Sequence, residues 1–213
     1  MKKHSKKRRS TNVKAESDLL SVALDHHQAG RIAQAEDGYQ RLLKARSDNA
    51  DAWHLWGVLA AQQGQFDSAV SRMQQALALK PHEPAFLGNL GNAFLKQGRL
   101  GQAIDCYREA LQHQPEDTAI RKSLATACER QLDLGIEHQQ GGRLAEAEAC
   151  YRDVLRGQPK RADAWHLLGA IALDQSDYEA AEERIKGALE LAPDAANFHN
   201  SLGRLHLQQR RYT

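Results

Sequence analysis

The side chains most capable of chemistry in this chain are ten histidines and three cysteines. Zinc sites need Cys, His or carboxylate ligands at short, fixed spacings, and no such spacing joins these residues. Phosphate binding, acyl transfer and metalloprotease chemistry each have a recognisable motif: a glycine-rich loop, a nucleophile elbow or His-Glu-x-x-His. The chain contains none of these motifs. We therefore expect no catalytic residues, no metal and no cofactor.

The histidines and asparagines are positioned by a motif of 34 residues. Three copies begin at Ala50, Pro84 and Ala162, and each has a glycine, two alanines and a late proline at the same places. The apolar residues of each copy follow two helical faces, which predicts two amphipathic helices per copy. A glycine facing an alanine permits a close helix crossing, a second glycine such as Gly64 ends the first helix, and the proline ends the second. Such units must stack to bury their apolar faces.

This arrangement resembles the tetratricopeptide repeat (TPR) in its Trp–Leu–Gly, alanine and proline positions. The resemblance covers nearly everything after residue 15. It implies an all-α solenoid of helix-turn-helix units that forms a right-handed superhelix. The chain is similar in particular to the repeat regions attached to bacterial O-linked N-acetylglucosamine transferase-like proteins and sulfotransferases.

Two degenerate copies extend the series into two three-repeat blocks. Block 1 covers residues 16–117, with repeats at 16–49, 50–83 and 84–117. Block 2 covers residues 128–213, with repeats at 128–161 and 162–195 and a partial repeat or capping helix at 196–213. Several short motifs recur 112 residues apart, such as residues 50–55 at 162–167. Duplication of a three-repeat block is the simplest explanation.

Residues 118–127 join the two blocks. No Gly or Pro interrupts residues 116–134, so we predict one continuous helix from about Asp117 to Gln140; a loop or a loose helical turn is the alternative. A change of stacking register at this joint predicts a hinge or bend. It also predicts an uncovered apolar face around Leu124 and Cys128, or around Leu134, that invites self-association into a homo-oligomer.

The ends of the chain and its cysteines bear on its location. Residues 1–14 hold seven Lys or Arg and no acid, which predicts a disordered basic tail over residues 1–15. The repeats carry no basic face to extend it, which argues against nucleic acid as a partner. No apolar run forms a secretory signal or a transmembrane segment. The odd number of cysteines indicates reduced thiols. We expect a cytoplasmic protein.

The resemblance implies a concave groove that is lined by the first helix of each repeat. The candidate binding residues share the positions that face this groove in the family. They are Leu20, Leu24, His54, Val58, Asn89, Asn92, Lys96, His166, Asn200 and Arg204.

The groove residues depart from two patterns known in the family. Members that clamp the terminal carboxylate of a peptide use Lys, Asn and Arg there, and here Leu20 stands where a clamp lysine would sit. This argues against recognition of a chaperone tail. Members attached to O-linked N-acetylglucosamine transferases often carry asparagine at one groove position in successive repeats. Asn89 matches this pattern, and Asn92 and Asn200 lie close to it. Each asparagine also fits a helix cap or a solvated surface residue.

Two classes of function remain open. The first is a protein–protein interaction scaffold that binds a peptide or helical segment in the groove, or assembles with copies of itself. The second is the N-terminal substrate-recognition region of a bacterial glycosyltransferase or sulfotransferase whose catalytic domain lies downstream. The second is motivated by the last residues, Tyr212 and Thr213, which stand where a second helix should start. A polar capping helix explains the same ending.

Overall fold

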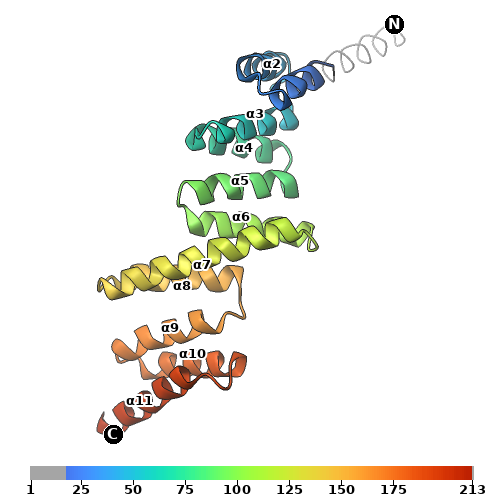
Figure 1. Cartoon of the computed structure of the whole chain (residues 1–213). Helices are drawn as coiled ribbons and strands as arrows, with labels where there is room; N and C mark the ends of the chain where they lie inside the picture. The colour runs from blue at the N-terminus through green and yellow to red at the C-terminus, as the bar shows by residue number, and fades with distance from the viewer. Residues whose placement is uncertain (1–17, 213) are drawn as a thin grey trace, which may run out of the picture. The chain divides into compact units, whose positions relative to one another are not determined.

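A computed structural model describes residues 18–212 of the protein, and these residues form helices and turns without a strand (Figure 1). The first helix is described over residues 18–28. The helices that follow are α2 (Ile32–Ala45), α3 (Ala50–Gln62), α4 (Phe66–Leu79), α5 (Pro84–Lys96), α6 (Leu100–His113), α7 (Thr118–Gln140), α8 (Leu144–Gly157), α9 (Ala162–Asp174), α10 (Tyr178–Leu191) and α11 (Ala196–Tyr212). The predicted basic tail at residues 1–15 lies outside the described residues.

The all-helical repeat predicted from the sequence is confirmed. The pairs α3–α4 and α9–α10 coincide with two of the 34-residue copies, and each pair packs extensively against itself. The chain divides into two compact units. Among the described residues, unit 1 consists of residues 18–98 and 109–115, and unit 2 consists of residues 99–108 and 116–212. The division into two three-repeat blocks stays a prediction.

Close helix crossings explain the glycine–alanine positions of the motif. A Cβ atom on Gly57 of α3 would lie 2.8 Å from Cγ of Met73 and 3.2 Å from the carbonyl oxygen of Ala69, both on α4. A Cβ atom on Gly169 of α9 would lie 2.7 Å from Cγ1 of Ile185 on α10. At both glycines the nearest of these atoms lies under 3.0 Å, too close for a Cβ atom, so glycine permits the close approach of the two helices.

The turns between paired helices use a left-handed residue. Gly142, which follows α7, has a φ of 74°, and the N–H of Arg143 donates to the carbonyl of His138 at 2.9 Å. This geometry is a Schellman-type helix end, which glycine adopts without a steric penalty. In the turn after α9 the same place is held by Ser176, whose φ is 62°. That residue carries the strain that glycine avoids.

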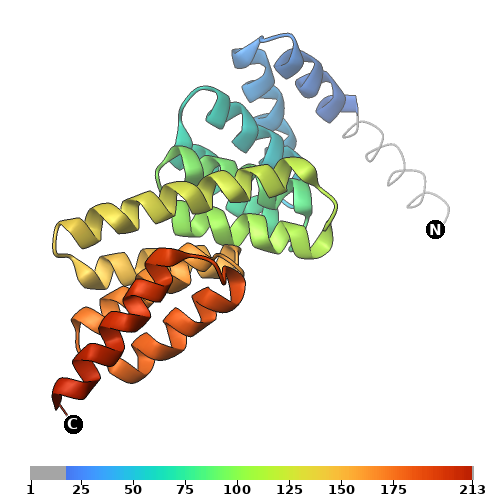
Figure 2. The ribbon, with the colours of Figure 1, turned by 60° about the horizontal axis from the view of Figure 1, so that its bottom comes forward.

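The joint is one helix, as predicted. Helix α7 runs without a break over Thr118–Gln140 and lies along α8 (Figure 2). Its first turn is capped by Asp117, whose side chain accepts hydrogen bonds of 2.9 Å from the backbone N–H groups of Ala119 and Ile120. The alternative of a loop is therefore wrong. The predicted hinge stays a prediction.

The expectation of an uncovered apolar face at Leu124 and Cys128 is wrong. Leu124 is 7% exposed and Cys128 is fully buried. A Cβ atom on Gly157 of α8 would meet Cys128, Ile104 of α6 and Leu124, so these side chains come together in unit 2. Helices α6 and α8 thus cover these two side chains, and the sequence alone did not predict this packing. Leu134 is partly buried. The reason given above for self-association at Leu124 and Cys128 no longer holds.

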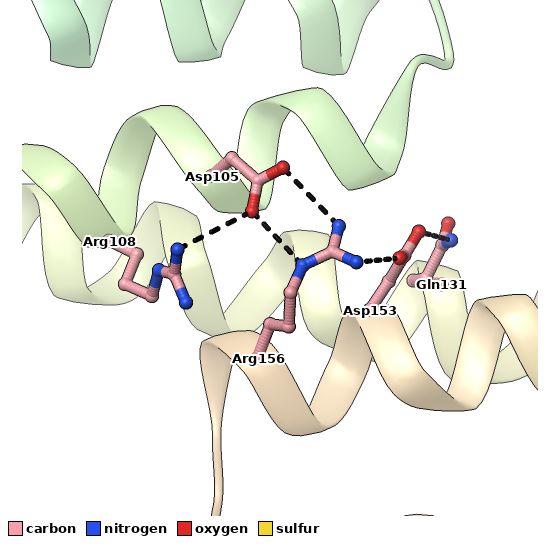
Figure 3. A network of polar contacts seen from close by, with 5 residues as sticks. All are labelled: Asp105, Arg108, Gln131, Asp153 and Arg156. Carbon is pink, nitrogen blue, oxygen red and sulfur yellow. Dashed lines mark hydrogen bonds and ion pairs between the residues drawn. The ribbon is translucent and has the colours of Figure 1, made fainter.

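Unit 2 also contains a chain of polar contacts around Arg156 of α8 (Figure 3). Its guanidinium binds Asp105 of α6 through two contacts of 3.2 and 3.3 Å and Asp153 through a third of 2.8 Å. The amide of Gln131 on α7 donates to the other oxygen of Asp153 at 2.7 Å. Burial raises the pKa of Asp153, although Arg156 and Gln131 favour the charged form. Side chains of α6, α7 and α8 are joined by this network.

A reciprocal exchange tests the role of the left-handed turn residues. We expect Gly142→Ser to lower the free energy of unfolding by about 1 kcal/mol, because serine at positive φ is strained. Ser176→Gly removes the same strain and should raise the free energy of unfolding by up to about 1 kcal/mol. Urea denaturation of the two variants measures both values. Shifts of the same sign in the two variants would contradict this account of the turns.

Candidate functional site

Unit 1 contains a pocket of about 430 Å³ between α3, α4 and α5, here called the unit 1 pocket. Four predicted groove residues line it: Val58, Asn89, Asn92 and Lys96. The full lining consists of Val58, Ala61, Gln62, Gly64, Phe66, Met73, Asn89, Asn92, Ala93 and Lys96. Residues from two repeats, which the sequence separates by some thirty positions, are thus brought to one place.

The lining combines apolar side chains with a few polar groups. Met73 and Ala93 are each 1% exposed, and Phe66 begins α4 beside them. The polar groups come from the first helix of each repeat, α3 and α5, and include three side-chain amides. Lys96, in the last turn of α5, is the cation of the lining. Mostly apolar pockets with a few directed polar groups are typical of ligand-binding sites.

His54 of α3 lies beneath the pocket lining and is not an open groove residue. It is 8% exposed, and its ring stacks on Phe86 with centroids 4.2 Å apart. Nδ2 of Asn89 donates a hydrogen bond of 2.9 Å to Nε2 of His54. Burial lowers the pKa of His54 to about 4, against a smaller opposite effect of Asp51. The ring of His54 is therefore neutral at pH 7, and it accepts the hydrogen bond that Asn89 donates.

Gln62 was not among the predicted groove residues, and it is held by a second histidine. Nε2 of His27 donates to Oε1 of Gln62 at 2.9 Å, and Nδ1 of His27 lies 3.0 Å from the hydroxyl oxygen of Tyr39. Since an amide oxygen can only accept, the proton is on Nε2, and in the neutral ring Nδ1 accepts from Tyr39. Burial raises the pKa of Tyr39 to about 12, which keeps its hydroxyl protonated. The repeat register could have identified Gln62, because it lies one repeat of 34 residues before the predicted groove residue Lys96.

The remaining predicted residues do not join this pocket. Leu20 packs against the core residues Leu42, Leu43 and Ala52. Leu24 is partly buried in the first helix and does not line the pocket.

Three other predicted residues belong to unit 2. Nε2 of His166 lies 2.9 Å from the hydroxyl of Ser201, and its ring stacks on Phe198 with centroids 4.5 Å apart. Burial lowers the pKa of His166. Arg204 pairs with Asp174 at 3.5 Å, and Asn200 is exposed on α11.

The place in unit 2 that corresponds to the pocket, 112 residues further along the chain, has different side chains. Ala61 corresponds to Leu173, which is 2% exposed. Gln62 and Asn92 correspond to Asp174 and Arg204, which form the ion pair just described. A buried leucine and a charge pair thus replace a small residue and two amides.

Reactive chemistry has little support in the part of the chain that the structure describes. Across residues 18–212, no group of three or more His, Cys, Asp or Glu side chains could hold a metal ion. Burial raises the pKa of the Cys128 thiol to about 11 and also raises that of Cys150. Both thiols therefore stay protonated at neutral pH and are poor nucleophiles. None of the helices within this range has the length and apolarity needed to cross a membrane.

Comparisons with protein families, curated proteins and solved structures all point to one family. The family model described as tetratricopeptide repeat matches residues 23–84, 54–118, 89–131, 132–183 and 167–213. A curated relative, the BBSome complex member BBS4 of Bos taurus, is 30% identical over 107 residues, which are 50% of this chain and 20% of that relative's length. The chain therefore spans only a small part of such relatives.

Two solved structures show the same architecture. A TPR repeats protein from Bacteroides fragilis is 17% identical, with a TM-score of 0.64 over 91% of this chain and 98% of that one. A mutant O-GlcNAc transferase from Thermobaculum terrenum is 25% identical, with a TM-score of 0.52 over 59% of this chain and 26% of that one.

Acid should destabilise the protein through His54. Because the pKa of His54 is lowered from 6.5 to about 4 by folding, the unfolded state binds more protons between these values. The free energy of unfolding should therefore fall by about 2 kcal/mol as pH drops from 7.5 to about 5. His54→Gln removes this contribution, whereas His206→Gln, at an exposed histidine, should not. Urea denaturation at both pH values measures the difference; an equal pH dependence in the two variants would refute it.

Proposed function

Because the chain belongs to the tetratricopeptide repeat family, we propose that it is a protein-interaction scaffold that binds a segment of a partner protein in the unit 1 pocket. The single observation that carries this proposal is the pocket itself. It combines an apolar lining, three amides and a lysine on neighbouring repeats. Such a surface buries one apolar side chain of a partner and bonds the polar groups that flank it.

The size and charge of the pocket agree with this role. A volume of about 430 Å³ lies within the range of pockets that take a ligand of modest size. Lys96 is exposed at the end of α5, so the partner segment is expected to carry an acidic group near its apolar anchor. The similar BBS4 protein is by its name a member of a complex, which supports a role in assembly.

Substrate recognition for a glycosyltransferase is the second candidate. The similarity to the O-GlcNAc transferase of Thermobaculum terrenum favours it, since that enzyme contains a region with the same architecture. In this case too the repeats would hold a protein segment, so the unit 1 pocket has the same role in both proposals. We propose a cytoplasmic location; the three free cysteines support it, since free thiols are usual in a reducing compartment.

Filling the pocket with a larger side chain should weaken binding. The probes are linear peptides that are selected from a displayed library for binding to the wild-type chain. We expect Ala61→Leu, which introduces the leucine that unit 2 carries at this place, to weaken the selected peptides by about tenfold or more through steric exclusion. Ala78→Leu, at an exposed residue of α4, is the matched control and should bind normally. Fluorescence anisotropy gives the dissociation constants, and circular dichroism checks that each variant is folded.

The proposal fails in either of two cases. Selection could yield no peptide that binds the wild-type chain. Alternatively, the selected peptides could bind Ala61→Leu as tightly as they bind the wild-type chain, which would place their site elsewhere.

A further inference from the structure

We propose that His27 and His54 are positioning residues that fix the hydrogen-bond polarity of the unit 1 pocket, so that it takes a peptide group of an extended partner segment. This inference rests on the proposed function and deepens it, because the sequence left open whether the partner is extended or helical. Four observations support it.

The first observation is the opposite orientation of two amides in one pocket. A side-chain amide has an acceptor end and a donor end, and the partner of one end decides what the other end presents. Gln62 accepts from His27 through Oε1, which leaves its NH₂ group for the pocket. Asn89 donates to His54 through Nδ2, which leaves its oxygen for the pocket. The pocket is therefore lined by one directed donor and one directed acceptor.

The second observation is that both histidines are themselves fixed. Nδ1 of His27 lies 3.0 Å from the hydroxyl oxygen of Tyr39, which donates to it when the proton of His27 is on Nε2, facing Oε1 of Gln62. His54 is buried and its ring stacks on Phe86. Burial lowers the pKa of His54, and the opposite effect of Asp51, which pairs with Lys80 at 2.8 Å, is smaller. With the proton of His27 on Nε2 and that of His54 on Nδ1, reversal of Gln62 would put donor against donor, and reversal of Asn89 would put acceptor against acceptor.

The third observation is chemical complementarity. The peptide group also has one acceptor and one donor: its carbonyl fits the NH₂ group of Gln62 and its N–H fits the oxygen of Asn89. In a helix the backbone groups are already paired with each other except at the ends. An extended segment has both groups free, and its side chain can enter the apolar part of the pocket. The pocket therefore favours an extended segment over a helical one.

The fourth observation is the contrast with unit 2. Gln139 stands in place of His27 and accepts directly from Tyr151 at 2.8 Å, and Asp174 stands in place of Gln62, so no histidine links the tyrosine to a second amide there. Ser201 stands in place of Asn89 against the equivalent histidine, His166. Unit 2 keeps the histidine and the stacked phenylalanine but has no amide pair. The arrangement in unit 1 is therefore not a requirement of the repeat.

Two small probes test the polarity directly. The first is N-acetyl-leucine N-methylamide, which has a leucine side chain and two peptide groups. The second is N-acetyl-leucine methyl ester, in which an oxygen replaces one N–H group. Chemical shifts of the side-chain NH₂ groups of Gln62 and Asn89, followed by NMR in the full chain, report binding. We expect both NH₂ signals to shift with the amide probe, which should bind about fivefold more tightly than the ester, as one lost hydrogen bond implies.

Variants connect this preference to the histidines. His54→Phe keeps a ring against Phe86 but cannot accept from Asn89, and it should abolish the preference for the amide probe. Asn89→Ser reproduces the His–Ser pair of unit 2 and should do the same, which keeps the test decisive if His54→Phe does not fold. His27→Phe should move the Gln62 signal and weaken both probes. His166→Phe, at the equivalent place in unit 2, is the control and should leave the preference unchanged.

Three results would overturn the inference: equal binding of the two probes, no shift at either amide, or an unchanged preference in Asn89→Ser. Failure of the proposed function is a separate outcome, because it is decided by the displayed peptides and Ala61→Leu. Peptides that bind in the pocket with the same affinity for the wild-type chain and for Asn89→Ser would support the scaffold function. They would contradict only the inference about hydrogen-bond polarity.

Discussion

The close crossing of the two helices in each repeat is the constraint on which the other features depend. At Gly57 and Gly169 the facing helix approaches to a distance that excludes any side chain. A larger residue would push the pair apart, and the alanines opposite, Ala69 and Ala181, would lose their complete burial. The first helices of consecutive repeats also come within reach of each other, as α3 and α5 do. Hydrogen bonds such as that of His54 with Asn89 span this distance.

The two units share the same frame and have different surfaces. The buried histidines His54 and His166 stack on phenylalanine in the same way, and each is bonded to the residue 35 positions further on. In unit 1 that residue is an amide beside a pocket, and in unit 2 it is a hydroxyl. Leu173, in place of Ala61, is buried where unit 1 has a pocket-lining methyl group. A few substitutions on a constant frame thus distinguish the pocket of unit 1 from the equivalent place in unit 2.

The joint shows how an interrupted repeat series is accommodated. Helix α7 is longer than its neighbours and packs along α8. Its apolar residues Leu124 and Cys128 are covered within unit 2. Arg156 bonds the carboxylates of Asp105 on α6 and Asp153 on α8. It therefore both neutralises and orients these two side chains. A partly buried carboxylate, Asp153, is tolerated because it has both a cation and an amide donor.

The sequence alone determined the helix pairs, the glycine turns, the close crossings, the TPR family and the continuous helix at 118–140. These features follow from local rules: helical periodicity, the left-handed preference of glycine and the absence of helix breakers. The sequence also identified the helix faces that hold Asn89, Asn92 and Lys96. Only the tertiary structure decided that His54 is buried under Asn89, that His27 holds Gln62 and that Leu124 is covered. Each of these outcomes depends on residues some 20 to 35 positions apart that meet across helices, and periodicity fixes which face a residue occupies but not what packs against it.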